Sequence, residues 1–180
     1  MRKLGLGLSW VVLAGFMAGF VVGCGGAVTP APLPVVKLPT KAPPTVTPVP
    51  ANDKEAVIQL VRAEGEGVVQ QDIDRLLDIW ATDGQMVDAN HTPDNAADDA
   101  KWIGRDAIRQ RYVNLVFPSA PMKAEAADLQ VALDGAKATI TSTTNIGDEV
   151  APGGDRWTIE KRNGRWYITS LTYNLEPASK

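Results

Sequence analysis

Hydrophobic and polar residues follow three successive patterns along this chain. Residues 4–22 are almost all apolar and follow a basic start. Residues 25–52 consist mainly of Pro, Val, Thr, Ala and Gly, with eight prolines and no acidic residue, so they cannot build a hydrophobic core. From residue 53 onward, apolar residues recur at the intervals typical of helices and strands. The remaining length suits one domain, which we predict at 53–180.

The first half of this domain predicts three helices. Asn52 is a candidate N-cap for the first helix, because Glu55 stands three residues later as in a capping box. Glu64 falls on the apolar stripe of that helix, which comprises Val57, Leu60, Val61 and Val68. A second helix is expected after Asp72 and before Asp83-Gly84, with one apolar face made of Ile73, Leu76, Leu77 and Trp80. The third is expected over Arg105–Phe117, where Pro118 ends it.

The other elements are predicted as strands and loops. Gln85–Ala89 is expected to be a short strand, in which an inward Met86 would place Asp88 on the same face. Asn90–Lys101 is polar and is expected to be a loop. Four antiparallel strands are expected at the end of the chain, joined by turns at Asp134-Gly135, Pro152-Gly153-Gly154 and Asn163-Gly164. The order of elements predicts an α+β fold, with helices on one face of an antiparallel sheet.

The N-terminal pattern indicates where the domain works. A basic start, an apolar run and small residues before Cys24 are the parts of a secretory signal. The ending Val21-Val22-Gly23-Cys24 resembles the lipobox of bacterial lipoproteins, which implies removal of residues 1–23 and lipid on Cys24. Residues 24–52 would then tether the domain to the extracytoplasmic face of the cell membrane. The alternative is an uncleaved membrane helix over residues 4–22.

Composition excludes several function classes. Cys24 is the single cysteine, so thiol catalysis, zinc fingers and iron–sulfur clusters are excluded. Residues 53–176 contain 21 acidic and 13 basic residues, an excess that makes nucleic acid an unfavourable partner. The same charge disfavours contact with anionic lipid, so lipid on Cys24 is the expected membrane anchor. No cofactor is predicted.

Several local motifs resemble the nuclear transport factor 2-like (NTF2-like) superfamily, which includes SnoaL-type cyclases and ketosteroid isomerases. The similar segments are Asp72–Leu77, Trp80–Gly84, Val87-Asp88, Gly104–Arg109 with Tyr112, and Arg165–Ile168. The resemblance covers residues 53–176 and implies a cone-shaped fold whose curved antiparallel sheet packs against three N-terminal helices. It also implies a homodimer formed through the sheet. It does not imply one activity, because this fold hosts enzymes as well as proteins without chemistry.

Asp88 and Glu64 are the candidate catalytic pair. Asp88 matches the general-base position of the isomerase branch, and burial in an apolar pocket suits a carboxyl group for moving protons. The branch also uses a tyrosine on the first helix as oxyanion donor, and that position is Glu64 here. Only a protonated Glu64 could donate to an oxyanion. The alternative places Glu64 on the rim, neutralised by Arg105 or Arg109.

The loop after Asp88 carries further candidate chemistry. His91 is the single histidine and could relay a proton beside Asp88, although a solvated loop histidine is the alternative. Asp94, Asp98 and Asp99 offer oxygen atoms suited to calcium but lack EF-hand spacing, so no metal site is predicted.

The candidate ligand-binding residues are Trp80, Met86, Trp102 and Tyr112. Their side chains could line an apolar pocket and stack on a flat ligand. Trp80 also suits a role in the core, whereas Trp102 suits a pocket mouth. Because the oxyanion tyrosine is replaced, the residues favour a module that binds a small apolar ligand or a protein partner. The alternative is an isomerase, dehydratase or cyclase with Asp88 as base.

Overall fold

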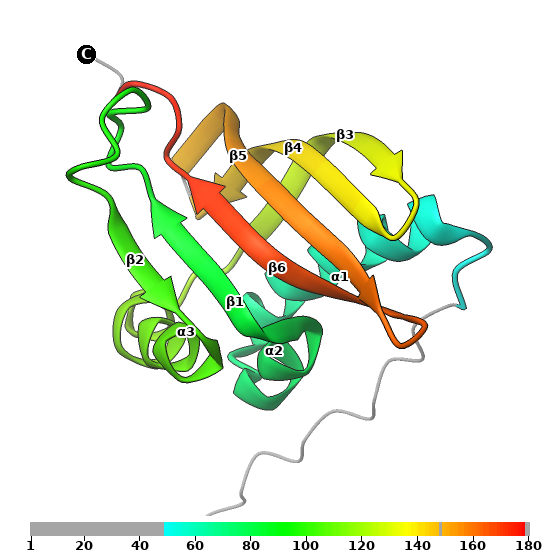
Figure 1. The fold of residues 1–180 in the computed structure, drawn as a ribbon. Coiled ribbons are helices and arrows are strands. Elements are labelled where there is room, and N and C mark those ends of the chain that lie inside the picture. Colours follow the sequence, from blue (N-terminus) through cyan, green and yellow to red (C-terminus); the bar gives the residue numbers. More distant parts are fainter. Residues whose placement is uncertain (1–48, 148, 179–180) are drawn as a thin grey trace, which may run out of the picture. The chain divides into compact units, whose positions relative to one another are not determined.

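The computed structural model describes residues 49–147 and 149–178 (Figure 1). Cys24, the predicted signal peptide at 1–23 and the predicted tether as far as residue 48 lie outside the described residues. In the described part of the chain, no helix is long and apolar enough to cross a membrane. One compact unit, Val46–Lys180, contains every described helix and strand, and we expect it to fold without the preceding residues because the whole described core lies within it.

Helix α1 (Asp53–Gln70) begins where the capping signal predicts. Asn52 accepts a hydrogen bond from the backbone N–H of Glu55 at 2.9 Å through its side-chain oxygen. The apolar stripe of α1 faces the core, where Val57 and Val61 are buried. Gly65 lies on the same side, and a Cβ atom added there would meet the carbonyl oxygen of Ala124 at 2.3 Å. The missing side chain therefore allows α1 to approach the sheet closely.

The second helix is shorter than predicted. Helix α2 (Ile73–Ile79) ends before Trp80, which starts strand β1 (Trp80–Asp88), so Asp83-Gly84 lies within the strand rather than ending the helix. Trp80 is opposite Ile168 of strand β6, and its indole is completely buried. Pairing and burial in the sheet therefore override the helical periodicity that placed Trp80 on the helix.

The segment predicted as a loop ends in a strand. Strand β2 (Ala100–Ile103) pairs antiparallel with β1, so that Trp102 is opposite Met86. Helix α3 (Arg105–Arg111) continues as a π-helical turn, η1 (Tyr112–Val116), and a 3₁₀ turn, η2 (Phe117–Ser119). The third helix is therefore regular only as far as Arg111, and Pro118, which lacks an N–H, lies in the tight final turn.

The remaining strands are β3 (Ala124–Asp134), β4 (Lys137–Ile146), β5 (Glu149–Arg162) and β6 (Arg165–Tyr173). The hairpins on either side of 135–136 and 163–164 are confirmed, although the first loop consists of Gly135 and Ala136, one residue later than predicted. The predicted turn at 152–154 is wrong, because these residues lie inside β5 at a register shift opposite β4. Gly147, whose φ of 58° is left-handed, lies in the actual β4–β5 connection.

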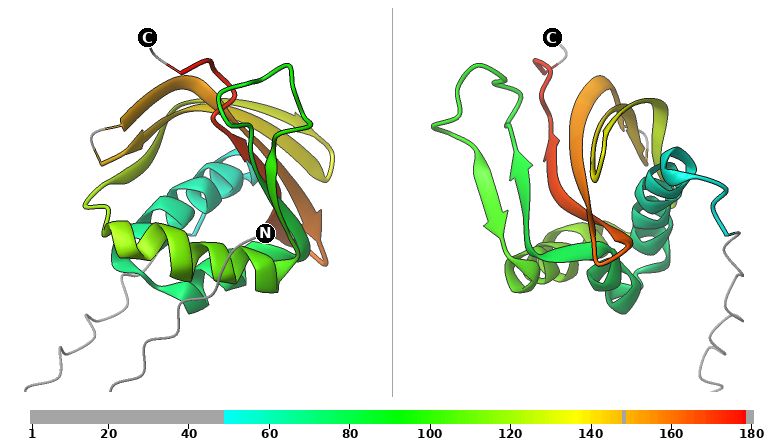
Figure 2. Two further views of the ribbon diagram at one scale, coloured as in Figure 1. Left: turned by 90° about the vertical axis from the view of Figure 1, so that its left-hand side faces the viewer. Right: turned by 45° about the vertical axis from the view of Figure 1, so that its right-hand side comes forward.

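The six strands form one sheet in the order β2-β1-β6-β5-β4-β3. Strands β1 and β6 are parallel, and the other neighbours are antiparallel. Figure 2 shows that the sheet curves over the helices, with α1 beneath β3 and β4 and with α2 and α3 beneath β1. The predicted α+β class and the segregation of helices to one face are therefore confirmed.

Candidate functional site

A cavity of about 370 Å³ lies between the inward face of the curved sheet and the helices. Its volume falls within the range of about 300–1,000 Å³ that is usual for small-molecule sites. Apolar side chains form much of its wall, and they include Val68, Val116, Ala126, Trp157 and Leu171. The ionisable side chains that line it are Glu64, Asp88, Arg111, Tyr112, Glu125, Asp155 and Tyr173.

A chain of hydrogen bonds supports Glu64 at the cavity wall. The Tyr112 hydroxyl donates to Glu64 Oε1 at 2.6 Å, and Trp80 Nε1–H donates to the same hydroxyl oxygen at 3.1 Å. Tyr112 and Trp80 are both fully buried, so these bonds satisfy polar atoms that water cannot reach. The carboxyl group of Glu64, on α1, is therefore held in place by Tyr112, a residue of η1 that is distant in sequence.

The environment of Glu64 favours its neutral form. Although Glu64 borders the cavity and is only half-buried by surface area, its carboxyl group lies deep among protein atoms, and this desolvation raises its pKa. The hydrogen bond from Tyr112 and the positive charge of Arg111 oppose that shift but do not cancel it. Burial and the adjacent Glu64 also hold the pKa of Tyr112 well above its usual value, so Tyr112 remains a donor.

Asp88 lies at the end of β1 and lines the same cavity. Its Oδ1 accepts hydrogen bonds from the backbone N–H of Asn90 at 2.9 Å and from the side-chain amide of Asn174 at 2.8 Å. Met86, two residues earlier, is buried in the core. The structure therefore brings Glu64 and Asp88 to one cavity, and it places Met86 and Asp88 on the same face of the strand.

Arg111 lies among three aromatic rings of the site. Its Cζ is 5.1 Å from the ring centroid of Trp102, 4.7 Å from that of Tyr173 and 6.0 Å from that of Tyr112. Its Nε–H donates to the Tyr173 hydroxyl at 3.3 Å. Burial also raises the pKa of Tyr173, with the nearby Asp88 adding to the shift and Arg111 opposing it.

Three side chains on β4 and β5, those of Ser142, Asp155 and Trp157, are linked by hydrogen bonds. Asp155 is 4% exposed and accepts a hydrogen bond from the Ser142 hydroxyl at 3.3 Å. The indole N–H of Trp157 donates to the same hydroxyl at 2.9 Å. Trp157 and Asp155 both line the cavity, so an indole and a carboxyl group belong to the same part of the sheet that forms its wall.

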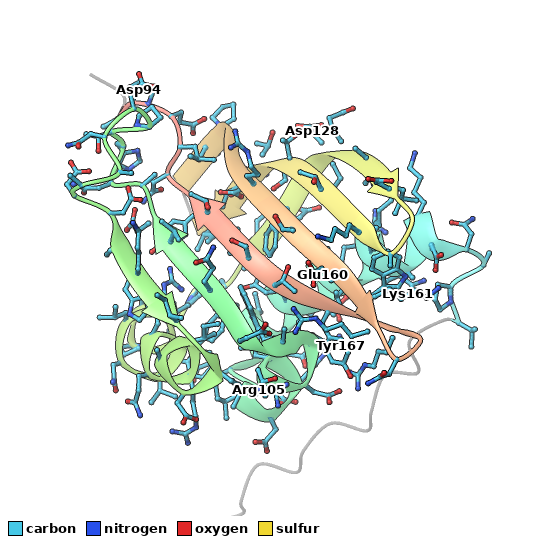
Figure 3. All side chains as sticks on the ribbon, in the orientation of Figure 1. Asp94, Arg105, Asp128, Glu160, Lys161 and Tyr167 are labelled. Atoms are coloured by element: carbon cyan, nitrogen blue, oxygen red, sulfur yellow. The ribbon has the colours of Figure 1, made fainter. Side chains whose placement is uncertain are left out.

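The structure does not bring His91 to the cavity. The backbone N–H of His91 donates to the carbonyl of Asn174, and its Nδ1 lies 3.0 Å from the carbonyl oxygen of Glu176. Asp94 lies farther along the same loop, near its tip (Figure 3). In the described part of the chain, no group of His, Cys, Asp and Glu side chains is arranged to hold a metal ion.

Two predicted ligand-binding residues line the cavity and two do not. Trp102 and Tyr112 are in its wall, whereas Trp80 and Met86 are fully buried behind it. Trp80 instead donates the hydrogen bond that orients Tyr112. The predicted rim position of Glu64, neutralised by Arg105 or Arg109, is also wrong, because Arg111 supplies the nearby positive charge and Arg105 donates to the carbonyl oxygen of Trp80.

Arg111, Tyr173 and Asp155 were not predicted as site residues. Tyr173 lies two residues after the buried Leu171, and Asp155 lies two residues before the buried Trp157. Strand alternation from those apolar residues could therefore have placed both side chains in the cavity wall. Arg111 lies three residues after Ile108 and four before Leu115, so helical spacing could have placed it on the apolar stripe of the third helix.

Solved structures with the same architecture come from several bacteria. A protein of unknown function with a cystatin-like fold from Nostoc punctiforme has 17% identity and a TM-score of 0.54, over 71% of this chain and 93% of that one. An NTF2-like protein with a cystatin-like fold from Novosphingobium aromaticivorans has 18% identity and a TM-score of 0.53, over 67% and 79% of the two chains. The domain has the NTF2-like fold.

A function-unknown protein from Mycobacterium tuberculosis shares this NTF2-like architecture, with 18% identity, a TM-score of 0.55 and coverage of 66% of this chain and 68% of that one. No protein-family model matches the chain, and no curated protein matches it. The resemblance to the isomerase branch, which rests on the sequence motifs alone, matches Glu64 to the tyrosine of that branch. A tyrosine hydroxyl still reaches that place, but it comes from Tyr112 and donates to Glu64.

Proposed function

We propose that this NTF2-like domain binds a small, mainly apolar molecule in the cavity. The observation that carries the proposal is the cavity itself, which has a ligand-sized volume, an apolar wall and a few polar groups held in fixed positions. Hydrogen bonds within the protein hold Glu64 and Asp88, so the cavity keeps its shape without a ligand. A preformed site loses little conformational entropy on binding.

The place of action is a second part of this proposal. Lipid on Cys24 would hold the domain at the extracytoplasmic face of the cell membrane, with residues 25–52 as a spacer. The lipobox-like ending at Cys24 and the proline-rich composition after it support this arrangement. A homodimer through the outer face of the sheet, which the family resemblance implies, also remains a prediction.

Binding of a neutral apolar fluorophore tests the cavity. We expect N-phenyl-1-naphthylamine to bind the Val46–Lys180 unit with one site per domain. Ala126→Phe should abolish this binding, because Ala126 lines the cavity and a phenyl group would fill it. Ala132→Phe is the matched control, since Ala132 is exposed on the same strand and does not line the cavity. Equal binding by the wild type and Ala126→Phe would contradict the proposal.

Proton transfer is the second candidate function. The observation that favours it is that Asp88 and Glu64 line one cavity, where burial favours the neutral form of Glu64. Asp88 would then accept a proton from the substrate while neutral Glu64 donates a hydrogen bond.

Deuterium uptake distinguishes the two functions. If the domain is an enzyme, a molecule that co-purifies with it should exchange a carbon-bound hydrogen in D₂O, and Asp88→Asn should prevent that exchange. The same molecule recovered without deuterium would contradict proton transfer and would leave binding as the function.

A further inference from the structure

Binding of a purely apolar ligand does not explain why the cavity contains the guanidinium group of Arg111. It is the one basic residue among the side chains described as lining the cavity, and its guanidinium lies over the rings of Trp102, Tyr112 and Tyr173. Cation–π contacts of this kind hold the group in place without using its N–H donors.

The donors of Arg111 are mostly unused by the protein. A guanidinium carries five N–H donors, and Tyr173 accepts from one of them. None of the ion pairs described within residues 49–147 and 149–178 involves Arg111. Three other arginines, by contrast, do form ion pairs: Arg75 with Glu66, Arg162 with Asp83 and Arg165 with Asp78.

Two acidic side chains of the cavity, Asp88 and Glu64, form hydrogen bonds with other residues. Asp88 accepts from the backbone of Asn90 and from the Asn174 amide. Glu64 accepts from Tyr112, and burial raises its pKa, which lowers its capacity to balance a cation. The cavity therefore contains a positioned cation that keeps free donors.

We propose that Arg111 binds the anionic oxygen group, of carboxylate type, of a small amphiphile whose apolar body fills the cavity. This inference rests on the proposed function, since it names the class of ligand that the cavity takes. The planar donor fork of arginine matches two oxygen atoms of such a group. The wall formed by Val68, Val116 and Leu171 would contact the apolar body.

A cationic ligand fits the site less well. The aromatic faces of Trp102 and Tyr173 that would receive a cation are already covered by Arg111. Such a ligand would have to displace the guanidinium or lie beside a like charge, and both are unfavourable. The carboxyl groups that also line the cavity would repel further anionic groups, so we expect the ligand to carry only one.

Two fluorophores that differ by one charged group test the inference on the Val46–Lys180 unit. 8-Anilinonaphthalene-1-sulfonate carries a sulfonate, whereas N-phenyl-1-naphthylamine has the same aromatic body without it. We expect Arg111→Gln to weaken binding of the sulfonate about tenfold or more, as for the loss of a charged hydrogen bond. Binding of the neutral fluorophore should change less than about twofold, because its contacts are apolar.

Arg109→Gln is the matched control, because Arg109 lies two residues earlier on α3, is exposed and does not line the cavity. It should change neither affinity. Arg111→Lys keeps the charge but loses the fork, so it should weaken sulfonate binding less than Arg111→Gln does, and it serves if Arg111→Gln does not fold.

Each outcome decides one claim. Loss of sulfonate binding alone in Arg111→Gln supports the anion site. An equal change for both fluorophores, or no change for either, would overturn it while leaving the cavity as a binding site. If the wild type binds neither fluorophore, the proposed function fails, and the inference fails with it.

Discussion

Replacing Tyr112 with phenylalanine removes the hydroxyl that links Trp80 to Glu64. The aromatic ring remains, so the volume of the core changes little. Two partners are affected, because the indole N–H of Trp80 loses its acceptor and Glu64 loses a donor at 2.6 Å. Trp80 is completely buried, and water cannot replace the lost bond on its side. Glu64 borders the cavity, so water can compensate there in part.

These two losses determine the expected magnitude. Leaving a buried donor unsatisfied costs about 1–3 kcal/mol, and a hydrogen bond between neutral groups contributes about 0.5–1.5 kcal/mol. Adding the two losses, we expect the free energy of unfolding to fall by about 2–4 kcal/mol. Removing a donor to Glu64 should also raise its pKa further, since that bond opposes the effect of burial.

Urea unfolding of the Val46–Lys180 unit at neutral pH measures this loss. Tyr167→Phe is the matched control, because Tyr167 (labelled in Figure 3) lies on β6 between the buried Trp166 and Ile168 and therefore faces away from the core. We expect the control to change the free energy of unfolding by less than about 0.5 kcal/mol. If Tyr112→Phe changed it by no more than the control does, the hydrogen-bonded chain would not support the site.

Three other changes test separate parts of the account. In the wild type, the raised pKa of Glu64 should lower stability as pH rises from about 4.5 through that pKa. Glu64→Gln does not titrate and should escape this loss. The free energy of unfolding of the variant, measured in urea and compared with the wild type, should therefore rise over that range by about 1.4 kcal/mol per unit between the folded and unfolded pKa of Glu64. A difference between variant and wild type that stays constant with pH would refute this. Gly65→Ala should cost about 1–3 kcal/mol, because its Cβ would meet the Ala124 carbonyl oxygen at 2.3 Å; unchanged thermal unfolding would count against that contact. Cys24→Ser should leave the domain unlipidated; a processed variant that still fractionates with membranes would disprove lipid anchoring.

Much of the fold could be predicted because local signals agreed with tertiary packing. The cap at Asn52, the hairpins of the second half and the inward face of β4 at Ala138 and Ile140 all follow from turn residues and alternation. The errors arose where tertiary contacts, rather than the local sequence, determined the secondary structure. Trp80 continues a helical stripe in sequence, but its burial against β6 makes it a strand residue. Strand β2 has only four residues, and its hydrophobic Ile103 is exposed. The sequence therefore shows no clear alternation of apolar and polar residues that would predict a strand there.

The candidate site also contains features that could be predicted from the sequence and features that could not. Asp88 could be placed from Met86, because side chains two residues apart on a strand share a face. Glu64 could be placed from the apolar stripe of α1. Arg111 lies on the stripe of Ile108 and Leu115 in the same way, but its contacts with rings from β2 and β6 arise only in the folded chain. His91 could not be placed from the sequence, since nothing in a polar loop indicates whether its side chain turns toward the cavity or toward Glu176.

The central claim is that the cavity holds a small molecule. Native mass spectrometry of the chain, isolated from the envelope of the organism that makes it, tests this claim most directly. We predict an adduct of small-molecule mass, one per domain, that is lost on denaturation and is absent from Ala126→Phe isolated in the same way. A wild-type protein that carries no adduct, or an adduct equally abundant on Ala126→Phe, would contradict the claim.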